Sequence, residues 1–181
     1  MSDAAVILPG FFGKLPATGD FVTRGLPATF VGTWDRWISR HLVHRFSQGS
    51  IEEHPVLRFL LGSEAFGPMT GVVMASADRA GRRFPLTIAA APPVAASDIG
   101  TSAAEWFDAL AAAGTLARQG ELDGDGLAAR LTSLPFPAIE ATDGLVRRMV
   151  FWVQRSEPIE VNPDVPELAL RQLLCEDLES G

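Results

Sequence analysis

Residues 10–21 read GFFGKLPATGDF, and residues 76–86 read SADRAGRRFPL. We call these stretches the first motif and the second motif. Both mix glycine, proline, acids, bases and large apolar side chains within a short span. Surface loops are ordinarily polar and core strands ordinarily apolar, so a segment with both kinds of residue is typical of a tight turn that returns directly into the core. Neither motif contains a catalytic signature.

The composition is that of a globular protein. The chain has 181 residues, of which 47% are hydrophobic and 20% are charged, and we expect one domain spanning residues 1–181. A net charge of −7 argues against nucleic acid and anionic membranes as general partners. No apolar run is long enough for membrane insertion, the N-terminus lacks a secretory signal, and Cys175 is the only cysteine. We therefore expect a cytoplasmic protein.

Hydrophobic periodicity and turn residues divide the chain into helices and strands. The first motif is predicted to be a turn-rich loop, and the second to connect two neighbouring strands, with residues 78–82 at its tip. Trp34 and Trp37 lie on the apolar stripe of the predicted main core helix. The predicted strands are residues 6–8, 69–75, 84–91 and 146–153, with a further apolar run at 56–61, and the predicted helices are 27–47, 102–119, 127–134 and 166–178.

This interleaving of strands and helices predicts an α/β fold. We expect a single domain with a central mixed β-sheet covered by helices on both faces, which is a three-layer α/β/α sandwich. The sequence contains no internal repeat and no convincing linker.

A phosphate-binding loop is the first chemistry that the first motif suggests, because Gly10, Gly13 and Lys14 follow the first predicted strand. A P-loop needs four residues between its glycines and a Ser or Thr after the lysine, whereas here two residues separate the glycines and Leu15 follows Lys14. A turn whose lysine pairs with an acid or faces solvent is the better interpretation.

Metal sites are poorly supported. His41 and His44 have a helical i, i+3 spacing, but no cysteine pair or acidic cluster accompanies them. The acids of residues 123–126 lack the remaining ligands of a calcium loop, so we expect Asp123 or Asp125 to cap a helix. Cys175 is expected to be a packing residue. We expect no metal and no cofactor.

The acids and bases of the two motifs are the remaining candidates. An aspartate beside glycine fixes a turn by accepting backbone N–H bonds, and an arginine can clamp a carboxylate across two loops. We therefore interpret the charges as an ion-paired junction between loops, which is also a suitable platform for a partner. The candidate residues are Asp20 and Asp78 with the bases Arg24, Arg79, Arg82 and Arg83.

The motifs taken together resemble the TagF family of proteins associated with bacterial type VI secretion. The resemblance rests on residues 11–21, the segment RGLP at 24–27, the segment WDRW at 34–37, the segment PVLRF at 55–59, and residues 71–86. Thr18, Leu57 and Ala75 depart from the family pattern. Beyond about residue 92 the similarity is only general.

The resemblance implies a cytoplasmic, non-enzymatic regulator that represses secretion after translation by binding other proteins of the apparatus, including a forkhead-associated scaffold protein. It assigns candidate partner-binding roles to Lys14, Asp20, Arg24, Asp78, Arg79 and Arg82. It assigns structural roles to Gly13, Pro16, Gly19, Trp34, Trp37, Gly81, Phe84 and Pro85. Two alternatives stay open: an enzyme that binds phosphate or a nucleotide, and a structural or assembly component of the apparatus.

Overall fold

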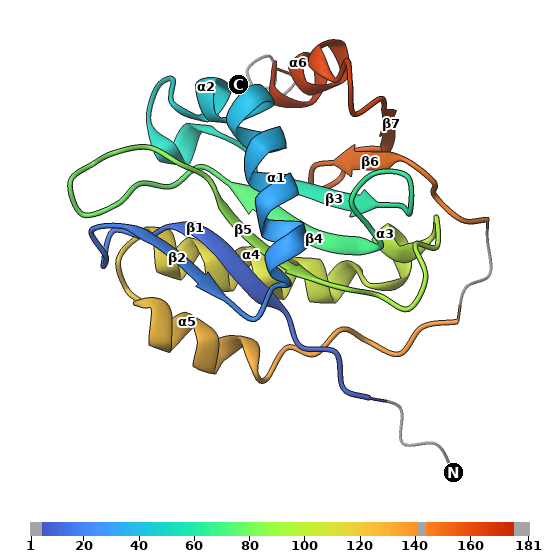
Figure 1. The fold of residues 1–181 in the computed structure, drawn as a ribbon, viewed down its shortest axis with the longest axis horizontal. Coiled ribbons are helices and arrows are strands. Elements are labelled where there is room, and N and C mark those ends of the chain that lie inside the picture. The colour runs from blue at the N-terminus through green and yellow to red at the C-terminus, as the bar shows by residue number, and fades with distance from the viewer. Residues whose placement is uncertain (1–4, 141–143, 176–181) are drawn as a thin grey trace.

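The computed structural model describes residues 5–140 and 144–175, and its centre is one antiparallel β-sheet (Figure 1). Within these ranges seven strands follow the order β2-β1-β5-β4-β3-β6-β7, and each neighbouring pair is antiparallel. The α/β class is confirmed, whereas the predicted mixed sheet is wrong. The strands are β1 (Gly10–Lys14), β2 (Phe21–Arg24), β3 (Leu57–Leu61), β4 (Met69–Met74), β5 (Leu86–Ala90), β6 (Met149–Trp152) and β7 (Ile159–Val161).

The connections explain why no parallel pair forms. Parallel neighbours need a helical crossover between adjacent strands, whereas short loops produce antiparallel hairpins. Here the helical segments join β2 to β3 and β5 to β6, which are not neighbours in the sheet. Short loops join β1 to β2, β3 to β4, β4 to β5 and β6 to β7, and each of these pairs is adjacent.

The predicted helices are present with shifted bounds. The helix predicted at 27–47 is divided at Leu42 into α1 and α2, and the helix predicted at 127–134 begins earlier, at Gly124, where the Asp123 carboxylate accepts the Gly126 N–H at 2.7 Å. Residues 176–178 of the predicted terminal helix lie outside the described residues. The helices are α1 (Ala28–His41), α2 (Val43–Phe46), the 3₁₀ turn η1 (Ile51–Glu53), α3 (Ile99–Ser102), α4 (Ala104–Arg118), α5 (Gly124–Leu131) and α6 (Glu167–Cys175).

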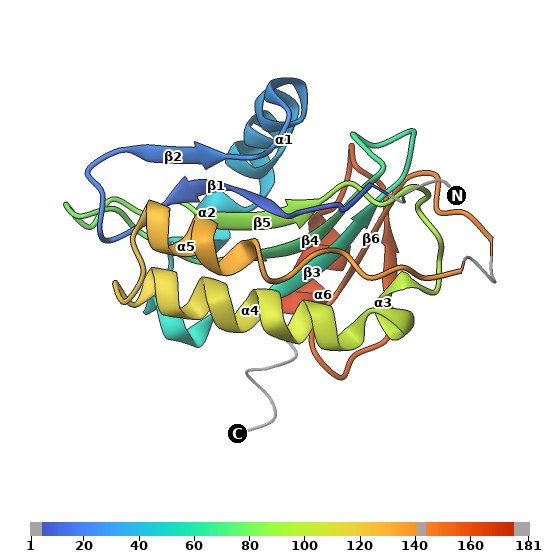
Figure 2. The same ribbon diagram turned by 90° about the horizontal axis from the view of Figure 1, so that it is seen from below.

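Buried side chains lie on both faces of the sheet. Successive strand residues point to opposite faces, so Phe59 joins one apolar cluster and Leu60 the other. Helices α1, α2 and α6 contribute to the cluster that contains Phe59, and α3, α4 and α5 contribute to the cluster that contains Leu60. Figure 2 shows α1 and α4 on opposite sides of the sheet.

The tryptophans of α1 anchor the first cluster, as the sequence predicts. Trp34 is fully buried, and its indole N–H donates to the Thr87 hydroxyl of β5 at 2.8 Å. Trp37 stacks on Trp34 at 5.3 Å between ring centroids and donates to the Pro163 carbonyl at 2.9 Å. These contacts fix α1 against the sheet.

Two expectations at the N-terminal end are wrong. Residues 6–8 are not a strand, because the Ile7 carbonyl accepts the N–H of Phe136, which belongs to a loop, and forms no ladder with the sheet. The first strand is instead Gly10–Lys14, inside the first motif.

Among the described residues, no helix combines the length and apolar character that crossing a bilayer requires.

Candidate functional site

The first motif is a β-hairpin. β1 and β2 pair from Phe11 opposite Arg24 to Lys14 opposite Phe21, and Pro16 lies in the turn between them. The Thr18 hydroxyl closes this turn, because it lies 3.2 Å from the Leu15 carbonyl oxygen and 3.1 Å from the Asp20 carbonyl oxygen. The motif therefore supplies strand and turn together, which explains its mixed composition.

The second motif is a turn built around the carboxylate of Asp78. One carboxylate oxygen accepts the backbone N–H groups of Ala80 at 3.0 Å and Arg82 at 2.9 Å. The Asp78 N–H in turn donates to the Arg82 carbonyl at 3.0 Å. Gly81 has a φ of +82°, a left-handed conformation in which glycine is favoured. This turn leads from β4 into β5, as predicted.

Asp78 also connects the second motif to the first. Its other carboxylate oxygen lies 2.8 Å from Arg82 Nε and 3.5 Å from Lys14 Nζ, the last residue of β1. The Asp78 side chain is fully buried, and 12% of the Lys14 side chain is exposed. Lys14 thus pairs with an acid, which is one of the two arrangements that the sequence predicts for this lysine. We call Lys14, Asp78, Arg79 and Arg82 the charged corner.

The two arginines of the charged corner bind the main chain of the first turn. Arg79 donates from Nη2 to the Ala17 carbonyl at 2.7 Å and from its backbone N–H to the Thr18 carbonyl at 2.8 Å. Arg82 donates from Nη2 to the Gly19 carbonyl at 2.7 Å. The second motif therefore holds the turn of the first through main-chain carbonyls and not through Asp20.

The pKa of Asp78 reflects opposing effects. Burial disfavours the charged carboxylate and acts to raise its pKa. The hydrogen bond from the Arg82 N–H, the charge and side-chain hydrogen bond of Arg82, and the charge of Lys14 together outweigh burial, so the pKa of Asp78 lies below its ordinary value. The aspartate is therefore an ionised structural anchor at neutral pH.

Aromatic rings pack beside this junction. Phe21 stacks on Phe12 at 5.9 Å between centroids and meets the edge of Phe84 at 4.8 Å. The Lys14 ammonium lies 4.9 Å from the centre of the Phe21 ring, within the range of a cation–π contact. Salt bridge and aromatic packing thus act on the same lysine.

Gly13 and Pro85 mark the closest approach of the two motifs. Gly13 has a φ of +145°, and a Cβ atom built there would lie 2.2 Å from the Pro85 carbonyl oxygen. Only glycine permits this spacing between β1 and the start of β5.

Three of the candidate residues, Asp20, Arg24 and Arg83, lie outside the charged corner. The Asp20 carboxylate accepts the N–H of its neighbour Phe21 at 2.8 Å. Arg24 lies at the far end of β2, where Nη2 is 2.5 Å from an oxygen of Asp125 on α5. Arg83 donates to the carbonyls of Phe46 and Gly49.

His41, which its spacing from His44 made a candidate metal ligand, and His54 both contact other protein groups. His41 pairs through Nδ1 with Glu167 at 2.9 Å, and a His54 ring nitrogen meets the Gln48 carbonyl. Within residues 5–140 and 144–175, no three or more His, Cys, Asp or Glu side chains are grouped so as to hold a metal ion. Asp123 is the helix cap that the sequence predicts.

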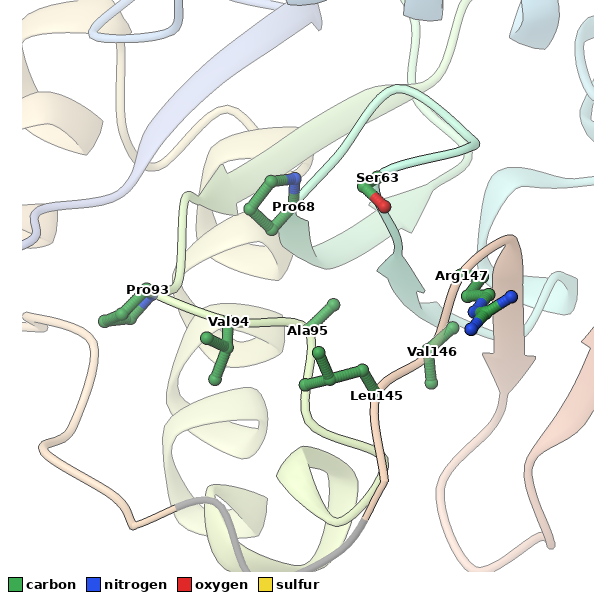
Figure 3. A pocket seen from close by; sticks show the side chains of 8 residues that line it. All are labelled: Ser63, Pro68, Pro93, Val94, Ala95, Leu145, Val146 and Arg147. Atoms are coloured by element: carbon green, nitrogen blue, oxygen red, sulfur yellow. The ribbon is translucent and has the colours of Figure 1, made fainter.

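Surface pockets are the features that the sequence did not reveal, because their walls come from distant segments. One pocket of ≈ 540 Å³ lies among the loops after β3 and β5 and the segment before β6 (Figure 3). Val94 and Leu145 are exposed in its wall, and Arg147 is the one charged side chain among the described residues that line it. A groove lies beside α1.

The sequence and the fold are similar to those of known proteins. Residues 10–134 match the family model described as the TagF N-terminal domain, type VI secretion system-associated. Among solved structures, the crystal structure of PA0076 from Pseudomonas aeruginosa PAO1 is similar, with 32% sequence identity and a TM-score of 0.60. That alignment covers 91% of this chain and 78% of the PA0076 chain. No curated protein matches the sequence.

Proposed function

Because the chain belongs to the TagF family of type VI secretion-associated proteins, we propose that it is a non-enzymatic regulatory protein of that apparatus. It acts in the cytoplasm after translation as a repressor, and it does so by binding other apparatus proteins. The forkhead-associated scaffold implied by the family resemblance is the first partner to test.

The proposal rests on the contacts that the charged side chains of the two motifs make. The Asp78 carboxylate binds Lys14, Arg82 and two backbone N–H groups, and the arginine heads bind main-chain carbonyls. These groups build a preformed surface, which is what sequestering a partner requires. Arg82 keeps 63% of its side chain exposed, so it is available to a partner while it holds the turn.

Deleting the gene and measuring export of the secreted tube protein tests the repressor role. We expect export to rise, and expression of the wild-type chain to restore the lower level. Loss of export would instead identify a component of the apparatus, and co-sedimentation with sheath or baseplate particles would locate it. Unchanged export would contradict a role in secretion.

A binding assay with the purified forkhead-associated protein tests the charged corner as the contact surface. Asp78 is unsuitable because it is buried, so Arg82→Ala and Arg79→Ala are the informative variants. Arg130→Ala is the matched control, because this exposed α5 residue makes no ion pair among the described residues. We expect weaker binding by folded variants of the corner only. Equal binding by all three would move the contact elsewhere and leave the motifs purely structural.

A further inference from the structure

A groove runs beside α1, on the side of the sheet opposite α4. One part has a volume of ≈ 480 Å³, and an adjoining part of ≈ 390 Å³ shares Thr33 and Phe66 with it. We call the two parts the α1 groove. α1 crosses in front of the sheet in Figure 1. The walls include Thr33, Arg36, Trp37, Arg40, Phe66 and Pro163.

Two exposed arginines line this groove. Arg36 and Arg40 are one helical turn apart, and neither makes an ion pair or side-chain hydrogen bond among the described residues. Asp164, which also lines the groove, forms no ion pair with either. By contrast, Arg45 and Arg58 each contact a carboxylate within 2.7 Å.

A contribution to the stability of α1 does not explain why Arg36 and Arg40 lie one helical turn apart. Like charges at i, i+4 repel each other and destabilise a helix slightly. Arg40 lies in the last turn of α1, where the helix dipole favours a cation, but Arg36 lies two residues after Trp34 in the middle of the helix. In a chain with a net charge of −7, two neighbouring cations that form no ion pair with the described residues create a local positive region, which attracts an anion.

The groove also offers apolar contact. Phe66 has a φ of +70°, a left-handed conformation that is rare for a bulky side chain and costs free energy. Gly62 stabilises this bend, because its carbonyl accepts the N–H groups of Ala65 at 3.0 Å and Gly67 at 2.9 Å. The strained loop places the Phe66 ring in both parts of the groove, with Phe30 and Met69 lining the second part.

We propose that the α1 groove binds an acidic, partly apolar peptide segment of a protein partner. Carboxylates of the segment pair with Arg36 and Arg40, and an apolar side chain packs against Phe66. Arginine forks form strong, directional hydrogen bonds with carboxylates, which makes charge the main determinant of the ligand. The inference rests on the proposed function only in that the chain acts by binding another protein.

Selection from a random dodecapeptide display library tests this inference. The protein is presented as wild type, as the double variant Arg36→Glu/Arg40→Glu, and as the control Arg130→Glu/Arg155→Glu, which changes the net charge equally at two other exposed arginines. We expect peptides selected on the wild type to combine Asp or Glu with apolar residues. They should bind the control normally and lose about tenfold or more in affinity for the α1 variant, because attraction becomes repulsion.

Several outcomes would overturn the inference: no enriched peptides, an enriched set without acids, or equal binding by the α1 variant. Thermal melting checks that each variant is folded, and the milder Arg36→Gln/Arg40→Gln pair replaces the charge reversal if that variant is unfolded. The secretion measurement keeps the two proposals separate. Increased export on gene deletion with no acidic-peptide binding rejects the groove alone, whereas unchanged export rejects the regulatory function whatever the groove binds.

Discussion

Asp78 determines how the charged corner responds to acid. Folding lowers the pKa of this carboxyl below its ordinary value of 3.8, so folding favours the ionised form. The resulting stabilisation is complete above the pKa of the unfolded chain and is lost as pH falls through the lower pKa of the folded protein. The contribution of Asp78 to the free energy of unfolding thus changes with pH only under acid conditions and is constant near neutrality.

Replacing Asp78 by Asn should therefore weaken the acid dependence of stability. Asparagine keeps one oxygen that can accept the N–H groups of Ala80 and Arg82, but it loses the charge that Lys14 and Arg82 neutralise. Urea unfolding between about pH 6 and about pH 2.5 measures the free energy of unfolding. We expect a lower value near neutrality and a smaller decline towards acid than in the wild type. Glu157→Gln, at an exposed site, serves as control; parallel declines in wild type and Asp78→Asn would refute the role of Asp78.

The roles of the charged residues were easier to predict from the sequence than the groups that they contact. The sequence indicated that an aspartate would fix a turn, and Asp78 does so. It also indicated an arginine that clamps a carboxylate across two loops, whereas Arg82 binds Asp78 within one turn and Lys14 is the residue that reaches Asp78 from the first motif. It did not reveal that Arg79 and Arg82 would also bind carbonyls of the first turn, nor that Arg24 would pair with Asp125 across 101 residues. The contacts between the two motifs depend on the pairing of β1 with β5, and the Arg24–Asp125 pair depends on where α5 lies beside β2. No local pattern specifies either arrangement.

At the scale of the secondary-structure elements, the motif glycines have unequal roles. Gly13 combines a positive φ with a backbone contact that leaves no room for a Cβ atom. Gly81 has a positive φ in open space, whereas Gly19 has an ordinary φ and nothing within 4 Å of an added Cβ atom. Alanine substitution therefore causes a steric clash at Gly13, backbone strain at Gly81 and neither of these at Gly19.

Alanine substitution at these glycines should produce a graded series of stabilities. Gly13→Ala must separate β1 from β5, and we expect a loss of about 3 kcal/mol or more, or failure to fold. Gly81→Ala should lose about 1–2 kcal/mol from left-handed strain, and Gly19→Ala should stay within about 0.5 kcal/mol of wild type. Chemical denaturation of the three variants measures the series. A Gly13→Ala protein as stable as Gly19→Ala would contradict the packing described for the two motifs.

Strand predictions failed where strands are short or lie at the sheet edge. β2 has four residues, none of them buried, so it lacks the alternation that identifies a half-buried strand. β1 contains two glycines among its five residues, a composition that predicts a turn. By contrast, β4 and β5 are buried along their whole length and were predicted, because continuous apolar runs mark strands covered on both faces.

For the whole molecule, the sheet unites the two halves of the chain. β3 lies between β4 and β6, so residues 149–152 complete a ladder that begins in the first half. The family model ends at residue 134, before this strand. The second half adds six buried side chains to the cluster beneath α1: Met149, Phe151, Val153, Val161, Leu170 and Leu173.

A fragment of residues 1–134 should consequently fail to fold as a stable monomer. Removing β6 turns the fully buried β3 into an open apolar edge, which favours aggregation. Burial of each lost aliphatic or aromatic side chain is worth about 1.5–3 kcal/mol, so six of them rival the whole stability of a typical domain, about 5–15 kcal/mol. A fragment of residues 1–175 is the control, because it retains every described element. Circular dichroism, thermal melting and size-exclusion chromatography compare the two. A monomeric 1–134 fragment with a cooperative melting transition would show that the family-matched segment folds without β6, β7 and α6, and that the second half is an addition to the fold and not part of its core.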